Sequence, residues 1–505
     1  MSPILILILL SLIGYKIYEF FTSVPPNVPP CLPRLPIVGS YWHLLWRNYN
    51  SPIEAIQYYV NKLRSRILTC YLGDAMAVIV TDYKSIKEVL SREEFDGRTS
   101  EIDIILDRSF RKKLGIFFTE EKFLQEQKRF ILRNMRDFGF GRRYEKYEAI
   151  MMEEMNLLVK MLKEGPINDK EKAYLKNGLI RFPDILYPYT ANSIWEIIFG
   201  ERFDRSEFHK LNDFCTSALQ FQRSGNPIGG AIAYFWYLKY FGNMFGYKEF
   251  IDSNKRMVKF IEEYLERNRH ADQDEDRGVL GRYLEEVKKN ENVTSNFTEQ
   301  QLIMTIVDIM FPSVSIVPST IVTIIKLVMH HPEVMRNVQK EIDRVVGIGR
   351  LVTWNDRKSL PYVEATIRET FRYETLTPTT VLHRALKDTT INGYNVPMNT
   401  VMVVSLKSIN QDPDLWGDPE KFRPERFLNE DGQLVKDFTL PFGLGRRMCI
   451  AETFSRYHMF EVFAVLLQNF NFSFVEGEPT GLEDKVPGLV ITPKETWVRV
   501  EPRYA

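Results

Sequence analysis

The sequence predicts one large, mainly α-helical domain with small β-sheets, placed behind an N-terminal membrane anchor. The 505 residues have a globular balance, with 44% apolar and 26% charged side chains. Long segments carry apolar residues at helical spacing, whereas β-prone runs are few and short. The chain also begins with an uncharged apolar run. Lysine plus arginine equals aspartate plus glutamate, at 66 each, so the net charge gives no support for a nucleic-acid partner.

The first segment, 1–24, is predicted to be the membrane anchor. Residues Pro3–Tyr15 contain no charged side chain, but a bilayer span needs about 20 apolar residues, so Lys16 and Glu19 must lie at its polar boundary. A cleaved signal peptide is the alternative, although no basic region precedes the run and no small-residue cleavage site follows it. Positive charge follows the run, which predicts that the rest of the chain is cytosolic.

A proline-rich strut, 25–45, is predicted next. Proline occurs repeatedly from Pro25 to Pro36, which favours a stiff and extended chain. Such a segment is suited to hold a domain at a distance from a membrane, and the simpler interpretation is a linker with no role beyond spacing. The remaining residues, 46–505, are predicted to form the globular domain.

The first half of that domain is predicted to be helical. Tyr144–Lys163 and Lys255–Arg269 show apolar residues on one helical face and charged residues on the other. Short strands are expected near Ile67–Tyr71 and Ala77–Thr81. His270–Arg282 is charged and poor in apolar residues, which indicates a surface loop.

A long buried helix is predicted from Thr298 to His330. Thr298 and Gln301 resemble a capping box, and the apolar middle of the segment predicts burial on all sides. At about 1.5 Å per residue the helix is roughly 50 Å long, enough to cross a domain. Pro332 ends it, since the residue before a proline avoids the α conformation. Further helices are expected at Pro332–Val346 and Pro361–Tyr373.

The composition changes after these helices. Thr389–Val404 has an Asn-Gly pair between β-prone runs and predicts a hairpin. Pro413–Phe442 is rich in proline, glycine and aspartate and shows no periodicity, and a stretch of this length without structure is usually functional. A helical run, Ala451–Leu467, follows.

Four cysteines are present, and one has unusual neighbours. No pair has CxxC or zinc-ligand spacing, which argues against a disulfide scaffold and fits a reducing compartment. Cys449 follows Gly443, Gly445 and two arginines and precedes a helical run, a setting that favours the thiolate. A single thiolate suits a haem iron, because the porphyrin supplies four other ligands. A buried core cysteine in a glycine turn is the alternative.

Three motifs occur in order along the chain. They are Glu369-Thr-Phe-Arg372, Phe422-Arg-Pro-Glu-Arg426-Phe427, and Phe442-x-x-Gly445-x-Arg447-x-Cys449. An i,i+3 ion pair alone is common on helices, but the three motifs together are specific. Over essentially its whole length, anchor and strut included, the chain resembles the cytochrome P450 family, and it looks most like microsomal, insect-type members.

The resemblance implies a cytochrome P450 fold in which 46–505 is a haem-thiolate catalytic domain. It implies haem b bound through the Cys449 thiolate, with Glu369, Arg372 and Arg426 interlocked as a buried charge cluster under the haem. By motif position it also implies four residues that contact the haem propionates: Arg98, Lys128, His383 and Arg447.

The sequence departs from the family pattern at three places. Ala451 replaces the usual glycine after the cysteine, which adds only one methyl group. Leu124 and Lys128 replace a tryptophan and an arginine, so a propionate meets a point charge instead of a planar fork. On the long helix, Ser315 and Ile316 replace the acid and threonine that in the family deliver protons to bound oxygen.

Two prolines on the long helix bear on that last departure. Pro312 and Pro318 each lack an N–H and crowd the carbonyl four residues earlier, so the freed carbonyls could hold waters. One hypothesis is that Ser313 or Ser315, together with waters, relays protons, which makes Ser315 a candidate catalytic residue. The alternative is that both serines only satisfy backbone groups.

The resemblance implies a monooxygenase that inserts one oxygen atom from O2 into a small hydrophobic substrate. NADPH–cytochrome P450 reductase is the implied electron donor, with cytochrome b5 as a second candidate, at the endoplasmic reticulum membrane and in contact with its lipid. A haem-thiolate isomerase or dehydratase acting on peroxides is one alternative, and a non-catalytic haem-binding protein is another. Candidate substrate-lining segments are Glu101–Leu114, Phe214–Phe235, Ile306–Ile316 and Leu376–Leu382.

Overall fold

The computed structural model describes residues 23–48, 52–98, 103–136, 145–224, 235–267, 278–290 and 295–504, together with residues 8, 11, 12, 14, 15, 18 and 20. Most of the predicted anchor, 1–24, therefore lies outside the described residues. The chain divides into two compact units, which are treated separately below. The first comprises Met1–Thr99 and Thr379–Ser405, and the second comprises Ser100–Pro378 and Leu406–Ala505.

The first unit is built on a four-stranded sheet with the order β1-β2-β8-β5. Strands β1 and β2 are antiparallel, with Ile67 opposite Val80, and β8 joins β2 in parallel. Both predicted strands are confirmed to within one or two residues. The elements of this unit are α2 (Tyr41–Arg47), α3 (Ala55–Leu63), β1 (Ile67–Leu72), β2 (Ala75–Val80), α4 (Tyr83–Ser91), η1 (Glu93–Phe95), β5 (His383–Arg384), β6 (Thr389–Ile391), β7 (Tyr394–Val396) and β8 (Val401–Val404).

The predicted hairpin Thr389–Val404 is correct only in its first part. Strands β6 and β7 form a hairpin around Asn392-Gly393. Val401–Val404, however, belongs to the four-stranded sheet, where it pairs with β2 and β5. The reason is burial, because all four of its residues are buried and such a strand fits the middle of a sheet better than the edge of an exposed ribbon.

The second unit is mainly helical. Its N-terminal elements are α5 (Asp103–Arg108), α6 (Glu121–Arg136), α7 (Glu145–Glu164), η2 (Glu171–Ala173), β3 (Leu175–Lys176), β4 (Leu179–Phe182), η3 (Asp184–Leu186), α8 (Tyr187–Phe199), η4 (Arg205–Glu207), α9 (His209–Arg223), η6 (Trp236–Phe241), α10 (Tyr247–Arg267) and α11 (Gly278–Lys289). Its later helices are α12 (Glu299–His330), α13 (Pro332–Val345), η7 (Trp354–Ser359), α14 (Pro361–Glu374), α15 (Leu406–Asn410), α16 (Pro413–Trp416), η8 (Pro424–Phe427), η9 (Gly445–Arg447) and α17 (Glu452–Asn469).

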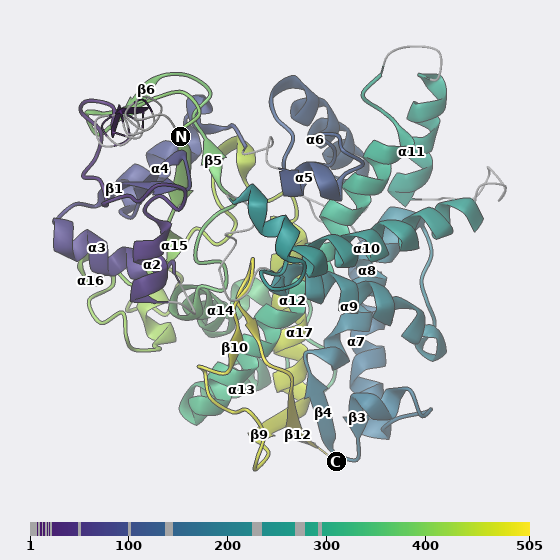
Figure 1. The fold of residues 1–505 in the computed structure, drawn as a ribbon. Helices are drawn as coiled ribbons and strands as arrows, with labels where there is room; N and C mark the ends of the chain where they lie inside the picture. The colour runs from purple at the N-terminus through teal and green to yellow at the C-terminus, as the bar shows by residue number, and fades with distance from the viewer. Residues whose placement is uncertain are drawn as a thin grey trace. The chain divides into compact units, whose positions relative to one another are not determined.

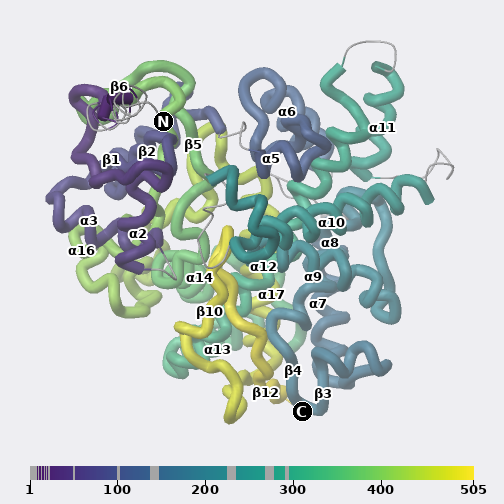
Figure 2. Tube along the Cα trace, in the orientation of Figure 1, coloured from purple at the N-terminus to yellow at the C-terminus, as the bar shows by residue number. Residues whose placement is uncertain are grey.

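Two small sheets complete the second unit. One has the order β3-β4-β12-β9, and the other pairs β10 with β11. Figure 2 shows β12, from the yellow end of the chain, beside the blue β4, as their antiparallel pairing requires. The C-terminal strands are β9 (Phe470–Phe474), β10 (Lys485–Val486), β11 (Thr492–Pro493) and β12 (Thr496–Pro502). The mainly helical fold with small sheets is thus confirmed.

Helix α12 is the core of the second unit. It contacts α8, α9, α10 and α17, and Figure 1 shows it next to α17. The Thr298 hydroxyl accepts from the Gln301 N–H, so the predicted helix start is confirmed. The helix continues through Pro312 and Pro318 to His330. Within the described residues it alone is long and apolar enough to span a membrane, but 89% of its most apolar window is buried in the protein, as in a core helix.

One prediction in this unit is wrong in part. The surface loop predicted at His270–Arg282 overlaps α11, which begins at Gly278, while 270–277 lie outside the described residues. Val279, Leu280 and Tyr283 are buried, so the segment has an apolar helical face that its charged neighbours obscured. The other predicted helices are confirmed as α7, α10, α13, α14 and α17.

Candidate functional site

The loop before Cys449 is held in a fixed turn. Gly443 and Gly445 have φ values of 73° and 72°, a conformation that side chains with a Cβ rarely adopt. The Cys449 N–H donates to the Phe442 carbonyl at 2.9 Å, which closes the loop. Helix α17 begins three residues later, at Glu452. The predicted glycine-rich loop at a helix start is therefore present.

Cys449 differs from the two buried cysteines in its exposure. The residue is exposed, unlike the buried Cys70 and Cys215, yet protein atoms surround the sulfur so closely that burial raises the pKa of its thiol. The Ala451 N–H and the Lys128 ammonium lower that pKa, but burial has the larger effect. Burial thus opposes the bias toward the thiolate that the helix start and the cations predict, and the thiolate stays a prediction.

The chemistry of the donor set fits a haem iron. Among the described residues, no three His, Cys, Asp or Glu side chains lie together in a group that could hold a metal ion. A single thiolate such as Cys449 suits an iron porphyrin, in which the porphyrin supplies four other ligands. The exposure of the Cys449 residue is compatible with such a bond.

Lys128 and Arg447 brace the cysteine loop. Lys128, on α6, donates to the carbonyls of Arg446 at 2.7 Å and of Met448 at 3.2 Å. Arg447 donates to the Thr119 carbonyl at 2.8 Å. The structure thus brings two of the predicted propionate contacts together beside Cys449.

Arg98 and His383 lie in the first unit and are close to each other. Arg98 donates to the carbonyls of Val381 and Leu382, at 3.4 and 3.1 Å, which directly precede His383. The Nδ1 atom of His383 is 2.8 Å from the Phe95 carbonyl oxygen. The six predicted site residues therefore form two groups, with Lys128, Ser315, Arg447 and Cys449 in the second unit.

The predicted charge cluster is present and buried. Arg372 makes two hydrogen bonds to Glu369, both at 2.7 Å, and both side chains have 0% exposure. Arg426 contacts the same carboxylate at 3.0 Å. The backbone N–H of Arg423 adds a further donor at 2.8 Å. One carboxylate thus receives two guanidinium groups and a backbone N–H, which compensates its burial.

The two arginines of this cluster also hold the irregular stretch around η8. Arg372 donates to the carbonyls of Asn410, Pro419 and Lys421 at 2.8 to 3.0 Å. Arg426 donates to the Trp416 carbonyl at 2.8 Å. Arginine–carbonyl contacts therefore hold Trp416–Lys421, and the stretch Pro413–Phe442 that was predicted to lack structure contains the short helices α16 and η8.

The serines of α12 are turned toward the helix backbone. Ser313 donates to the Ile309 carbonyl at 2.8 Å, and Ser315 donates to the Phe311 carbonyl. Both residues are buried, with 3% and 0% exposure. This is the i−4 bond that helical serines commonly form, and it agrees with the alternative in which they only satisfy backbone groups.

The sequence analysis missed an ion pair on the same helix. Asp308 binds Arg108 of α5, and their side chains have 0% and 1% exposure. A signal was available, because Asp308 is the only charged residue between Glu299 and Lys326. A charge in a helix buried on all sides requires a partner. The partner could not be identified from the sequence, since it lies 200 residues earlier.

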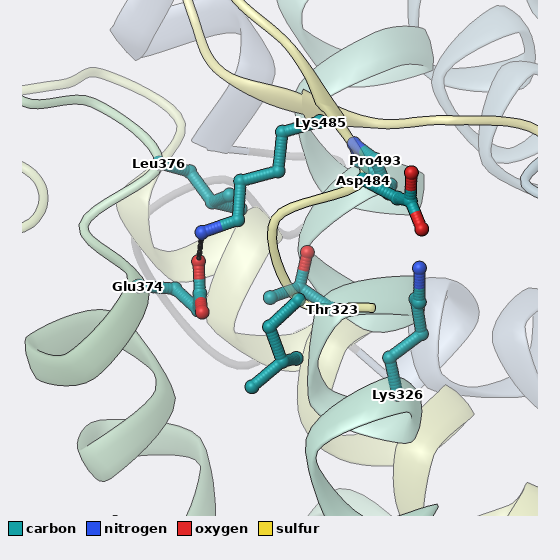
Figure 3. A pocket seen from close by; sticks show the side chains of 8 residues that line it. Thr323, Lys326, Glu374, Leu376, Asp484, Lys485 and Pro493 are labelled. Carbon is teal, nitrogen blue, oxygen red and sulfur yellow. Dashed lines mark hydrogen bonds and ion pairs between the residues drawn. The ribbon is translucent and has the colours of Figure 1, made fainter. Parts of the chain in front are cut away.

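A separate polar pocket opens at the far end of α12. Figure 3 shows Lys326 facing Asp484, while Lys485 binds Glu374 on the other side. The cavity volume is about 10 Å³, which is space for roughly one water molecule. It is too small for a substrate, and we do not assign it to the candidate site.

Comparison with known proteins identifies the family. The cytochrome P450 family model matches residues 29–500. The chain belongs to the cytochrome P450 family. Farnesoate epoxidase of Bombyx mori is 27% identical over 484 residues, with 94% of each chain covered. Cytochrome P450 2B9 of Mus musculus is 29% identical over 504 residues, with 98% of this chain and 96% of the relative covered. Cytochrome P450 2B12 of Rattus norvegicus is 31% identical over 478 residues, with 92% of each covered.

Membership establishes the kind of reaction. This P450 is a monooxygenase that inserts one atom of O2 into a hydrophobic substrate, with electrons derived from NADPH. The family carries a haem whose iron is bound by a cysteine thiolate. The relatives do not favour the isomerase or the non-catalytic alternative.

Proposed function

We propose that Cys449 is the thiolate ligand of haem b in this monooxygenase. The observation that carries the proposal is the braced loop, in which the Cys449 N–H binds the Phe442 carbonyl and Lys128 binds two neighbouring carbonyls. When bound, the haem supplies the reduction of O2 and O–O cleavage, which the thiolate favours by donating electron density. The role of the loop is to hold the sulfur at a fixed position.

The proposed contacts of the protein with the haem propionates are supported by the charge and the position of four side chains. Arg98 and His383 offer a guanidinium and an imidazole from adjacent points of the first unit. Lys128 and Arg447 offer an ammonium and a guanidinium beside the cysteine loop. Cationic donors of this kind bind carboxylates by charge-assisted hydrogen bonds.

Ser315 is the proposed proton carrier. Its hydroxyl donates to the Phe311 carbonyl, so in a relay it turns from that carbonyl, donates its proton to one water molecule and accepts a proton from another. The family acid at this position is absent, so a relay here depends on a serine hydroxyl, which is a much weaker acid than a carboxyl group. Uncoupled release of hydrogen peroxide is the expected consequence.

The test of Cys449 is its replacement by serine, with Cys215→Ser as the matched control. Cys215 is a free cysteine buried in α9, so the control removes a thiol without touching the loop. We expect Cys449→Ser to lose the thiolate signature of the reduced carbon monoxide spectrum and Cys215→Ser to keep it. Retention of that spectrum in Cys449→Ser would contradict the proposal.

The relay is tested on the reconstituted enzyme with its reductase. The double variant Ser313→Ala/Ser315→Ala is expected to release more hydrogen peroxide per NADPH consumed than the wild type. Thr320→Val is the control, because the Thr320 hydroxyl makes the same i−4 bond, at 2.9 Å to Ile316. Equal peroxide release in wild type and double variant would leave the serines with a structural role only.

We further propose that 1–24 anchors the protein in the endoplasmic reticulum membrane, that 25–45 is the strut, and that the haem-thiolate domain, 46–505, is cytosolic. The apolar run and the positive charge that follows it support this topology. NADPH–cytochrome P450 reductase is the proposed electron donor, and cytochrome b5 is a further candidate. Removal of 1–24 is expected to shift the protein from the microsomal pellet to the alkaline-carbonate supernatant, whereas pelleting of the truncated protein would contradict the anchor.

A further inference from the structure

Two opposite charges lie on the first turns of α17, next to the cysteine loop. Glu452 is the first residue of the helix and follows Cys449 by three positions. The Oε1 atom of Glu452 accepts from the Nε atom of Arg456 at 2.9 Å. The side chains of Glu452 and Arg456 are 29% and 23% exposed, so both are partly withdrawn from water. Neither residue has a role in the haem ligation proposed above.

Glu452 is favourable for the helix but unfavourable for a thiolate. A carboxylate in the first turn of a helix interacts well with the N–H groups there, and an acid four residues before a base is the better order for a helical ion pair. Burial raises the pKa of the Cys449 thiol most, and the Glu452 carboxylate raises it further, whereas the Lys128 ammonium lowers it. The negative charge of Glu452 therefore acts on the sulfur.

Arg456 also contacts the cysteine loop itself. Its guanidinium lies over the ring of Phe442, 4.8 Å from the ring centroid. The Phe442 carbonyl is the acceptor of the Cys449 N–H, at 2.9 Å. Phe371 of α14 meets the same ring edge-on, with the two centroids 5.8 Å apart. Phe442 is thus held by side chains of two helices, and one of these side chains carries a positive charge.

The two charges have opposite effects on an iron bound at Cys449. Reduction of the iron adds one negative charge next to the sulfur, so a nearby carboxylate opposes reduction and a nearby guanidinium favours it. Partial exposure weakens both effects through solvent and salt but does not remove them. Because Glu452 and Arg456 are paired, each largely cancels the effect of the other.

We propose that Arg456 is a positioning residue for the monooxygenase reaction, which neutralises Glu452 and holds Phe442 and thereby keeps the reduction potential of the haem iron high enough for electron uptake. The proposal rests on the proposed haem ligation by Cys449 and goes beyond it, because it assigns control of the potential to a pair that does not bind haem. Without Arg456, an unpaired carboxylate remains beside the thiolate, and the iron accepts an electron less easily.

The test is the midpoint potential of the haem iron in the purified holoenzyme. It is measured by spectroelectrochemical titration without reductase, so that docking of a partner does not contribute. Glu452→Gln removes the negative charge and leaves Arg456 on Phe442, so the ratio of reduced to oxidised iron at a fixed potential should rise at least about threefold. This factor corresponds to about 28 mV, at about 59 mV per tenfold for one electron. Arg456→Gln should change the ratio by a similar factor in the opposite direction.

Two further variants separate the charge of Arg456 from its shape. Arg456→Lys keeps the positive charge and should keep the potential near the wild-type value, and a potential equal to that of Arg456→Gln would overturn the charge role. The double variant Glu452→Gln/Arg456→Gln removes both charges and should also lie near the wild type. Shifts of the same sign in the two single variants would overturn the proposal, because distortion of the loop would then change the potential.

Salt gives an independent check of the electrostatic origin. The Debye length falls from about 10 Å at 0.1 M salt to about 3 Å at 1 M, so the difference in potential between Glu452→Gln and the wild type should shrink as salt is added. A difference that is the same at both salt concentrations would overturn the electrostatic role of the pair.

Glu88→Gln is the matched control. Glu88 forms the same i,i+4 pair, with Arg92 at 2.7 Å, and the two side chains are 30% and 29% exposed. Arg92 likewise lies over a phenyl ring, that of Phe95, at 5.0 Å. The pair belongs to the first unit, whereas the cysteine loop belongs to the second, so Glu88→Gln should leave the potential unchanged. A shift equal to that of Glu452→Gln would overturn the proposal, since loss of a carboxylate elsewhere would then have the same effect.

The reduced carbon monoxide spectrum of each protein separates this proposal from the proposed ligation. If the thiolate signature is present throughout, unchanged potentials in both single variants overturn the role of the pair alone. Absence of the signature in the wild type would instead refute Cys449 as the ligand. If Arg456→Gln does not retain haem, Glu452→Gln decides the question, because a raised potential supports the proposal and an unchanged one overturns it.

Discussion

Two buried glutamates in the second unit, Glu369 and Glu461, differ in their ionic partners. Glu369 has 0% exposure and binds two guanidinium groups and one backbone N–H. Glu461 of α17 has 1% exposure, and it accepts from the Trp354 N–H at 2.7 Å. No ion pair to Glu461 is found among the described residues. Burial accordingly raises its pKa to about 8, and the Trp354 N–H and Tyr457 lower it only in part.

The difference shows what each region requires. Glu369 orients two arginines whose remaining donors order the irregular stretch around η8, so its charge is part of the architecture. Glu461 lies on the buried α17, near Tyr457 and three residues after the buried His458, whose pKa burial lowers to about 3. There burial shifts the pKa values of Glu461 and His458 toward the neutral form of each group. One region therefore depends on charge and the other on its absence.

The largest effect is expected for Glu369→Gln. The amide leaves Arg372 and Arg426 buried without their carboxylate, and breaking a buried pair in this way costs about 3–5 kcal/mol. The free energy of unfolding from urea titration and the haem content of the purified protein should both fall. Arg423→Gln is the control, since the side chain of Arg423 is half exposed and should matter little. Equal stability of the two variants would mean that Glu369 is not essential to the cluster.

A smaller, pH-dependent effect is expected for Glu461→Gln. The pKa of Glu461 is raised from 4.5 to about 8 by burial, so between these values the unfolded chain binds fewer protons than the folded one. The wild type should therefore lose stability as pH rises through this window, by at most about 1.4 kcal/mol per pH unit. The variant, which cannot ionise, should lack this contribution.

Urea titrations from pH 5 to 8 give the comparison of Glu461→Gln with the wild type. Glu430→Gln, at an exposed position, controls for the general loss of one carboxylate. If the stability difference between wild type and Glu461→Gln is the same at every pH, Glu461 is charged in the folded protein and the comparison with Glu369 fails.

The sequence was sufficient for the parts of the fold that local patterns determine. Thr298 and Pro332 marked both ends of α12, and strands β1 and β2 followed from β-prone runs. The partner of Val401–Val404 was not predictable in this way, because a strand of four buried residues does not reveal the strand it pairs with. The start of α11 was missed because charged residues precede it.

In the candidate site, too, features that follow from motifs were predicted, whereas contacts between distant residues were not. The cluster of Glu369, Arg372 and Arg426 followed from motif resemblance, and its buried geometry is confirmed. The pair of Asp308 and Arg108 matched no motif, and it joins residues 200 positions apart in the chain. Only the folded chain shows that Arg108 is the partner. The environment of the Cys449 sulfur could not be predicted either, because a sequence lists neighbouring cations but not the burial that raises the pKa of the thiol.

The smallest effect is expected at Lys326, the cationic counterpart of Glu461. Its ammonium lies in the small pocket of Figure 3 and donates to the carbonyls of Pro479 and Gly481, both at 3.2 Å. Burial lowers its pKa, and the more distant Asp484 and Glu374 offset this only in part. Lys326→Met removes a poorly compensated charge and keeps most of the side-chain volume, so the free energy of unfolding should change by no more than about 1 kcal/mol.

The free energy of unfolding of Lys326→Met is measured by urea titration at neutral pH and compared with that of Glu369→Gln. The comparison decides whether Lys326 belongs with the unpaired groups. One water in the cavity of about 10 Å³ can satisfy the carbonyls that the variant leaves without a donor. A loss of about 3 kcal/mol or more would show that Asp484 and Glu374 act on Lys326 as true ionic partners. Lys326 would then be a paired buried charge like Glu369. Among the three groups compared, Glu461 of α17 would be the one without an ionic partner. A change near zero extends the rule seen at Glu461 to a buried cation, namely that a group without an ionic partner contributes little through its charge.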